Sequence, residues 1–263
     1  MITRFAIIAS VALGGTAPLR ADDGVDAQTQ LKNYLRGISG SEAGRSHPLT
    51  GEGIPETFPD YALFSHIFPL YPVARPAPEP LKSTNIIAIP KAKGQKPILI
   101  TDTKELEKFF QQHARSVKKA TEADEATTAW LRAVAELHQD GYFQFTIQSQ
   151  GTKVEGVKMI STGEARVDPR NMDKGQITAQ LTFQEGRLMT VETKVNISAG
   201  IRPRCQATKL LDPDPIVRAM AEDALRVMGS SAKPYLDEQY QKASPELKKA
   251  IDRIREQIDQ EGR

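Results

Sequence analysis

The sequence predicts an α+β fold: a four-stranded antiparallel meander covered by two helices and followed by a group of C-terminal helices. Three observations support this expectation. Residues 102–117 and 122–138 repeat apolar side chains at helical spacing. Residues 143–197 contain stretches in which apolar and polar side chains alternate, as they do in half-buried strands. Residues 209–258 contain cap and stop signals that delimit three short helices.

The first predicted helix begins after Asp102, because Asp102 and Glu105 have the spacing of a capping box. Its apolar face carries Leu106, Phe109, Phe110, His113 and Val117. The second predicted helix runs from about Glu122 to His138 and stops at Gly141. Its apolar face carries Ala126, Trp130, Ala133, Val134 and Leu137. An antiparallel sheet with one apolar face needs such stripes to cover it.

The alternation places strands at 143–148, 177–184 and 189–197. A weaker strand is expected at Lys153–Val167, interrupted by Gly156 and Gly163 and therefore bulged. The pair Glu185-Gly186 predicts a tight turn that joins two strands into a hairpin. The polar face is rich in Thr and Gln, and we expect it to be solvated. The order of two helices and a long meander over residues 101–200 resembles the cystatin-like and NTF2-like cone folds.

The first 21 residues are predicted to be a secretory signal peptide. Arg4 supplies the positive start, residues 5–15 form an apolar run that is short for a bilayer, and cleavage is expected after Ala21. A retained N-terminal anchor is the alternative. We therefore expect a periplasmic or secreted protein with no membrane span after the signal is removed.

The charge of the chain restricts its partners. The formal net charge is +2, but Arg4 and Arg20 belong to the predicted signal, and the remaining chain carries 33 basic and 33 acidic residues. Nucleic acids and anionic membranes bind basic surfaces. The balanced charge therefore argues against both as partners.

Residues 22–100 are expected to form a proline-rich, irregular arm. Nine prolines lie between positions 48 and 90, and prolines at this density exclude long helices and central strands. Within the arm, only a short helix at Gln28–Leu35 and short strands at Ile86–Ile89 and Ile98–Ile100 are predicted.

An aromatic cluster at residues 58–71 is too apolar for a solvated linker. One interpretation is that it packs on the following domain. The other is that it binds another protein, as proline-rich segments often do. In that case Phe64, Phe68 and Tyr71 are the candidate partner-binding residues.

The C-terminal segment, residues 201–263, contains a weak internal repeat. Asp214-Pro215 and Ser244-Pro245 each have the pattern of an N-cap followed by proline at the first helical position. A shift of 30 residues aligns these two pairs and also aligns Val217 with Leu247. With Asp214, Val217 and Arg218 at its opening, and Gly229 after an Ala-rich helix, the first unit resembles a HEAT repeat of the bacterial kind.

This resemblance implies protein binding or scaffolding, and it makes Arg218 a further candidate partner-binding residue. Solenoid repeats need about three copies to bury a continuous core. We therefore expect the segment to be a terminal cap that docks on the α+β domain, with Leu210 and Leu211 at the joint. Its buried stripe is expected to comprise Val217, Met220, Ala221, Ala224, Leu225 and Met228.

No catalytic, metal-binding or cofactor-binding pattern is recognisable. The four histidines lack metal-site spacing, and no nucleophile elbow, P-loop or dinucleotide fingerprint occurs. His113 is expected to be a satisfied core residue. Cys205 is the only cysteine and is expected to be a buried thiol, the alternatives being a reactive thiol or a disulfide with a partner.

Together these observations predict an exported, non-catalytic protein that acts as a scaffold or adaptor by contacting another envelope or extracellular protein. The alternative is a small-ligand binding protein with a pocket between the helices and the curved sheet. Filling of that space by Trp130, Phe109 and Phe145 would argue against this alternative.

Overall fold

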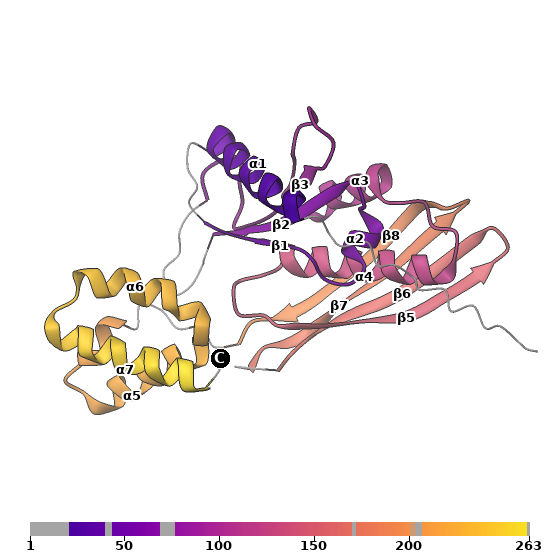
Figure 1. The fold of residues 1–263 in the computed structure, drawn as a ribbon. Helices are drawn as coiled ribbons and strands as arrows, with labels where there is room; N and C mark the ends of the chain where they lie inside the picture. Colours follow the sequence, from indigo (N-terminus) through magenta and orange to yellow (C-terminus); the bar gives the residue numbers. More distant parts are fainter. Residues whose placement is uncertain are drawn as a thin grey trace, which may run out of the picture.

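The computed structural model describes residues 21–39, 44–68, 77–169, 172–200, 202 and 207–261, in which the chain forms two four-stranded antiparallel sheets and several helices (Figure 1). The first sheet consists of β1 (Arg45–Pro48), β2 (Tyr61–Ile67), β3 (Thr84–Pro90) and β4 (Ile98–Ile100). The second consists of β5 (Phe145–Glu155), β6 (Lys158–Val167), β7 (Lys174–Gln184) and β8 (Arg187–Ser198). The helices around them are α1 (Ala21–Ser39), α2 (Ile54–Thr57), α3 (Thr103–His113) and α4 (Ala120–Leu137).

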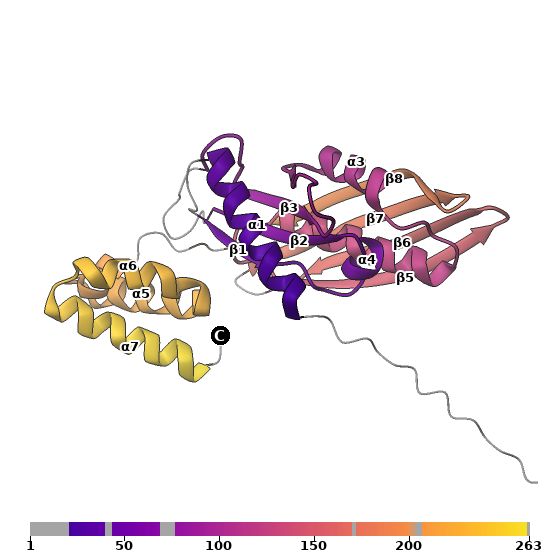
Figure 2. The same ribbon diagram turned by 45° about the horizontal axis from the view of Figure 1, so that its top comes forward.

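These elements stack in four layers. α1 covers one face of the first sheet, and Leu31 and Leu35 of the helix share a buried cluster with Phe64 and Ile87 of the sheet. α2, α3 and α4 fill the space between the two sheets, and the second sheet forms the outer layer (Figures 1 and 2). The prediction of an α+β fold is therefore confirmed.

The second sheet is the predicted meander, with its strands in the order β5-β6-β7-β8. Glu185 and Gly186 both have positive φ, 51° and 80°, and Gln184 pairs with Arg187 across them. This backbone matches the two-residue hairpin turn that the sequence predicts.

The strand expected at Lys153–Val167 begins later than predicted, at Lys158. Residues Lys153 to Glu155 belong to β5, and Gly156 lies in the turn that leads to β6. The register shift lies in β5 between Ser149 and Gly151, not in β6. Gly163 instead lies where α4 packs closely on the sheet, since a Cβ there would lie 2.9 Å from Cδ1 of Leu131.

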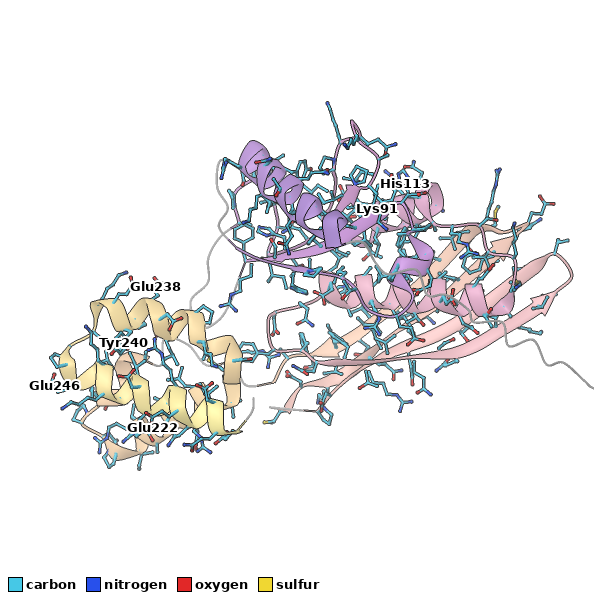
Figure 3. All side chains as sticks on the ribbon, in the orientation of Figure 1. Lys91, His113, Glu222, Glu238, Tyr240 and Glu246 are labelled. Carbon is cyan, nitrogen blue, oxygen red and sulfur yellow. The ribbon has the colours of Figure 1, made fainter. Side chains whose placement is uncertain are left out.

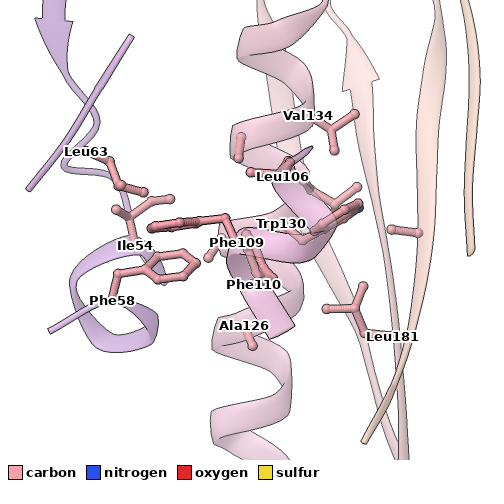
Figure 4. Packing of buried hydrophobic residues seen from close by; sticks show 14 of the residues in the cluster. Ile54, Phe58, Leu63, Leu106, Phe109, Phe110, Ala126, Trp130, Val134 and Leu181 are labelled. Carbon is pink, nitrogen blue, oxygen red and sulfur yellow. The ribbon is translucent and has the colours of Figure 1, made fainter. Parts of the chain in front are cut away.

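Asp102 caps α3 as predicted, although Glu105 accepts from the backbone N–H of Thr101 and not from that of Asp102, and the helices cover the apolar face of the meander. The side chain of Asp102 accepts hydrogen bonds from the backbone N–H groups of Lys104 and Glu105 at 3.0 and 2.9 Å. Trp130 of α4 is fully buried, and its ring meets that of Phe110 edge to face at a centroid distance of 5.0 Å (Figure 4). One core cluster therefore joins both sheets through the helices between them.

The expectation of an irregular arm at residues 22–100 is wrong, although the helix and the two strands predicted within it lie in α1, β3 and β4. This part of the chain forms α1, α2 and the whole first sheet, and every residue of β3 is buried. The described prolines that belong to a helix or strand lie at its end: Pro48 ends β1, Pro55 is in the first turn of α2 and Pro90 ends β3. Strand interiors thus keep their hydrogen-bond donors.

The C-terminal segment folds into its own helical group. It contains a 3₁₀ turn η2 (Ala207–Leu211), α5 (Pro215–Met228), a 3₁₀ turn η3 (Gly229–Ala232), α6 (Lys233–Lys242) and α7 (Pro245–Glu261). Its core comprises Leu210, Ala221, Leu225, Met228, Leu236, Ile251, Ile254 and Ile258, among others. Tyr240 lies between α6 and α7, with the guanidinium carbon of Arg255 4.7 Å from its ring centre (Figure 3).

The expectation that this segment docks its apolar stripe on the α+β domain is wrong. The buried stripe of α5 faces α7 and η2 of the same segment, because these elements together enclose a core. Leu210 is buried in that core, whereas Leu211 is 46% exposed. Among the described residues outside the segment, Tyr142 packs against the core.

None of the helices within the described ranges is both long enough and apolar enough to cross a membrane.

Candidate functional site

Two of the predicted partner-binding residues lie in the core. Phe64 and Phe68 are 4% and 2% exposed and pack beneath α1. The expectation that they face a partner is therefore corrected, because α1 covers them. Tyr71 lies outside the described residues, and the part of the aromatic cluster that is described, from Phe58 to Phe68, packs inside the molecule.

Arg218 lies at the start of α5 and is half-buried. Its Nη1 atom donates hydrogen bonds to the backbone oxygens of Asp212 and Pro213 at 2.6 and 3.1 Å. These contacts hold the loop that leads into the helix. A role of Arg218 in partner binding stays a prediction.

Three exposed apolar side chains of the helical group gather on one side of α5. We define the α5 surface as Ile216, Met220 and Val227, which are 69%, 67% and 39% exposed. Positions 216, 220 and 227 are separated by one and then about two helical turns, so they lie along one face of the helix. The opposite face carries the fully buried Leu225.

Met220 was expected in the buried stripe, and this expectation is wrong. The apolar arc of α5 is wider than the contact that α7 and η2 make with it, so only Ala221, Leu225 and Met228 are buried. Met220 and Ile216 lie at the uncovered side of this arc. The helix is nevertheless well anchored, because the side chain of Asp214 accepts a 2.8 Å hydrogen bond from the backbone N–H of Ile216.

The charged side chains around the α5 surface are held by hydrogen bonds and ion pairs. The guanidinium of Arg218 is directed at backbone oxygens, and that of Arg226 binds Glu261 of α7. The carboxylate of Asp223, on the same face as Ile216 and Met220, is 75% exposed and pairs with Arg226 at 3.4 Å.

A buried ion cluster lies where the helical group leaves the second sheet. Arg202 is 4% exposed at its side chain and binds Asp140 at 2.6 Å and Asp173 at 2.7 Å. Burial by itself lowers the pKa of Arg202, but the two carboxylates outweigh this effect and raise the pKa. Its guanidinium carbon also lies 4.7 Å from the ring centre of Tyr142, the residue that packs on the helical core. This arrangement fixes the base of the C-terminal segment.

A groove of about 260 Å³ lies between the end of β1 and α4. Its polar residues include His47, whose Nε2 atom is 3.4 Å from the carboxylate of Glu136. The hydrogen bond to Glu136 raises the pKa of His47. Arg132 at the same groove donates to the backbone oxygen of Glu52 at 3.0 Å. A histidine beside a carboxylate can exchange a proton near neutral pH, and this is the chemistry that the groove offers.

The space between the helices and the second sheet is filled by side chains. Trp130 is fully buried there, and Phe145 packs against the same cluster, whereas the ring of Phe109 packs against those of Phe58 and Tyr61 on the side of the first sheet (Figure 4). This filling argues against the small-ligand alternative. His113, expected in the core, is half-buried and forms a 3.0 Å hydrogen bond with the hydroxyl of Tyr61, and burial lowers its pKa. Within the described ranges, no group of three or more His, Cys, Asp or Glu could hold a metal ion.

No family model matches the chain, and no curated protein or solved structure matches it either.

Ile216 and Val227 are the site residues that sequence reasoning missed. Neither belongs to the apolar stripe that predicts the core of α5, so neither was considered as a binding residue. The sequence signal for them is the number of apolar residues in α5, which is larger than one buried stripe accommodates. An apolar residue outside the stripe of a short, capped helix is the feature to look for.

Proposed function

We propose that this chain is an exported protein that binds another envelope or extracellular protein through the α5 surface and acts by contact, not by catalysis. One observation carries the proposal: Ile216 and Met220 are about two-thirds exposed on a capped helix whose other face is packed. Large apolar side chains that gather on a rigid element characterise binding surfaces.

The chemistry of the α5 surface specifies the kind of partner. A helix with an apolar face typically docks into an apolar groove on another protein. A lipid surface is a poorer fit, because residues 207–263 carry ten basic and eleven acidic residues and interfacial helices are rich in Lys and Arg.

Export is supported by the first 21 residues, with Arg4 followed by the apolar run at 5–15. Binding is also in keeping with the resemblance of the segment around Asp214, Val217 and Arg218 to a HEAT repeat. An exported chain would meet its partner in the envelope or outside the cell.

The experiment uses a photo-crosslinking amino acid in place of Met220 in the full chain, expressed in its native cells. We expect one dominant adduct with an envelope or secreted protein. The same label at Lys249, an exposed position on α7, is the control and should give no such adduct. With the partner purified, Met220→Glu should weaken its binding by at least about tenfold, since a charge would enter an apolar contact.

The variant Lys249→Glu serves as the matched control for binding and should leave the affinity unchanged. Equal adducts from positions 220 and 249 would contradict the proposal. So would full binding by the Met220→Glu variant.

A further inference from the structure

β8 is an edge strand of the second sheet. It pairs with β7 on one side, and within the described ranges no strand pairs with its other side. Its side chains reflect this position: Val195 is 40% exposed, although its partner Ile177 on β7 is fully buried. An edge strand offers a row of backbone N–H and C=O groups that can pair with another strand.

The two edges of this sheet are not equivalent. The β5 edge is interrupted by the register shift at Ser149 and Gly151, and Asp124 of α4 binds the hydroxyls of Ser149 and Thr152 at 3.0 and 2.7 Å. Bulges of this kind protect an edge from pairing. From Thr190 to Ser198, β8 pairs with β7 without a shift, so its outer edge is regular over this stretch.

The sequence of that stretch is self-complementary. Residues 191–195 read Val-Glu-Thr-Lys-Val, so the apolar residues are symmetric about Thr193 and the charges are opposite. In antiparallel pairing, residues directly opposite each other share one face of the sheet. Pairing of β8 with its own copy, centred on Thr193, therefore places Glu192 of each chain opposite Lys194 of the other.

We propose that the protein forms a twofold symmetric dimer through the β8 edge, centred on Thr193, in which the two meanders join into one continuous sheet. The same register places Val191 opposite Val195 of the second copy, on the face that the helices cover. It thereby shields a valine that the single chain exposes. A twofold interface must be self-complementary in this way.

The charges select this register over its neighbours. A twofold antiparallel pair always places one residue opposite its own copy. Centring the pair on Glu192 would oppose two carboxylates, and centring it on Lys194 would oppose two ammonium groups, which destabilises the pairing. Centring it on Val191 or Val195 leaves both charges without an opposite partner. Of these five registers, only the one centred on Thr193 places unlike charges opposite each other.

The central residue is held in place from beneath. The indole Nε1 of Trp130 donates a 2.9 Å hydrogen bond to Oγ1 of Thr193. Trp130 itself is fully buried in the core. The middle of the β8 edge is thus already ordered in the single chain, so pairing loses little conformational entropy of the strand.

The first test measures the dimer dissociation constant of the full chain by sedimentation velocity over a concentration series. Glu192→Lys and Lys194→Glu should each weaken the dimer by at least about tenfold, because two symmetry-related pairs become repulsive. The double variant, with both substitutions, should restore the wild-type constant, because it restores unlike charges across the seam.

Lys153→Glu on β5 is the matched control. It changes the net charge as Lys194→Glu does, lies on the opposite edge strand, and should leave the dimer unchanged. Glu192 and Lys194 are exposed, so the variants are expected to fold, and circular dichroism checks this. A wild-type chain that stays monomeric at about 100 μM, the upper range of a weak specific contact, would overturn the proposal. A dimer whose constant does not respond to either charge reversal would overturn it too.

A second test reports the register directly. With Cys205 replaced by Ser, a mixture of Glu192→Cys and Lys194→Cys chains should form a disulfide-linked dimer on mild oxidation, because opposite Cβ atoms lie within reach of a disulfide. Either variant alone should crosslink at least about tenfold more slowly. Equal rates in the mixture and in the separate samples would contradict the Thr193 register. The seam uses β8 and not α5, so this result and that of the partner-binding test are independent.

Discussion

The indole Nε1 of Trp130 and the hydroxyl of Thr193 are joined by a hydrogen bond of 2.9 Å, and this bond ties the centre of the core to an edge strand. Trp130 lies on α4 and is fully buried, and Thr193 lies in the middle of β8 and is half-buried. A buried indole N–H needs an acceptor. The helix and the last strand of the meander therefore depend on each other.

Thr193→Val is expected to lower the free energy of unfolding by about 1–3 kcal/mol, because it keeps the shape of the side chain but leaves the buried N–H of Trp130 unsatisfied. Equilibrium unfolding in urea measures this change. Thr193→Ser keeps the hydroxyl and should recover most of the loss. Thr190→Val, at an exposed position of the same strand, is the control. Equal stability of the two valine variants would show that the bond contributes nothing.

The contact between His47 and Glu136 predicts a pH dependence. The hydrogen bond to Glu136 raises the pKa of His47 above its ordinary value of 6.5. Because the folded-state pKa is the higher one, the stabilisation is fully present below pH 6.5 and is lost as the pH rises through the folded-state pKa. Glu136→Gln should lower the pKa of His47 in an NMR titration.

His113 is an internal control in the same titration. Burial lowers its pKa, so it should titrate below 6.5 and be unaffected by Glu136→Gln. A His47 resonance that titrates below that of His113 in the wild-type protein would contradict the predicted direction.

Gly163 is expected to tolerate no side chain. A Cβ there would lie 2.9 Å from Cδ1 of Leu131 and 3.0 Å from the backbone oxygen of Gln148, so Gly163→Ala should destabilise the fold by about 1–3 kcal/mol. Gly37 in α1 has nothing within 4 Å of the same position, and Gly37→Ala should stabilise the fold by about 0.5–1 kcal/mol. Chemical denaturation of both variants gives the comparison, and effects of the same sign would refute it.

Arg202→Met is expected to lower the free energy of unfolding by about 3–5 kcal/mol, because it leaves the carboxylates of Asp140 and Asp173 buried without their cation. The measurement is urea denaturation followed by tryptophan fluorescence. Lys209→Met removes the cation of an exposed pair with Asp212 and should barely change stability. A loss for Arg202→Met as small as that control would show that the buried cluster is dispensable.

The sequence by itself determined the features that depend on local chemistry. The cap at Asp102, the cap at Asp214 and the turn at Glu185-Gly186 each follow from residues within a few positions of one another. The meander follows from alternation, because one of its faces is apolar and the other is polar. These signals need no knowledge of distant parts of the chain.

The first sheet was predicted only in part. The apolar runs at Ile86–Ile89 and Ile98–Ile100 indicated strands and lie in β3 and β4, whereas β1 and β2 were not predicted. β1 gains its regularity from pairing with β2, some twenty residues away in the sequence, so only the tertiary structure shows that these strands form one sheet. The density of prolines led to the wrong prediction of an irregular arm, because prolines indicate where elements end and not whether elements form.

Exposure was likewise decided by tertiary structure. Met220 and Leu225 are both apolar residues of α5, and only the position of α7 and η2 buries one and leaves the other in solvent. Phe64 and Phe68 show the opposite case: the sequence suggested that they face a partner, but α1 covers them. Apolar character is a property of the residue, but burial depends on which element packs against it.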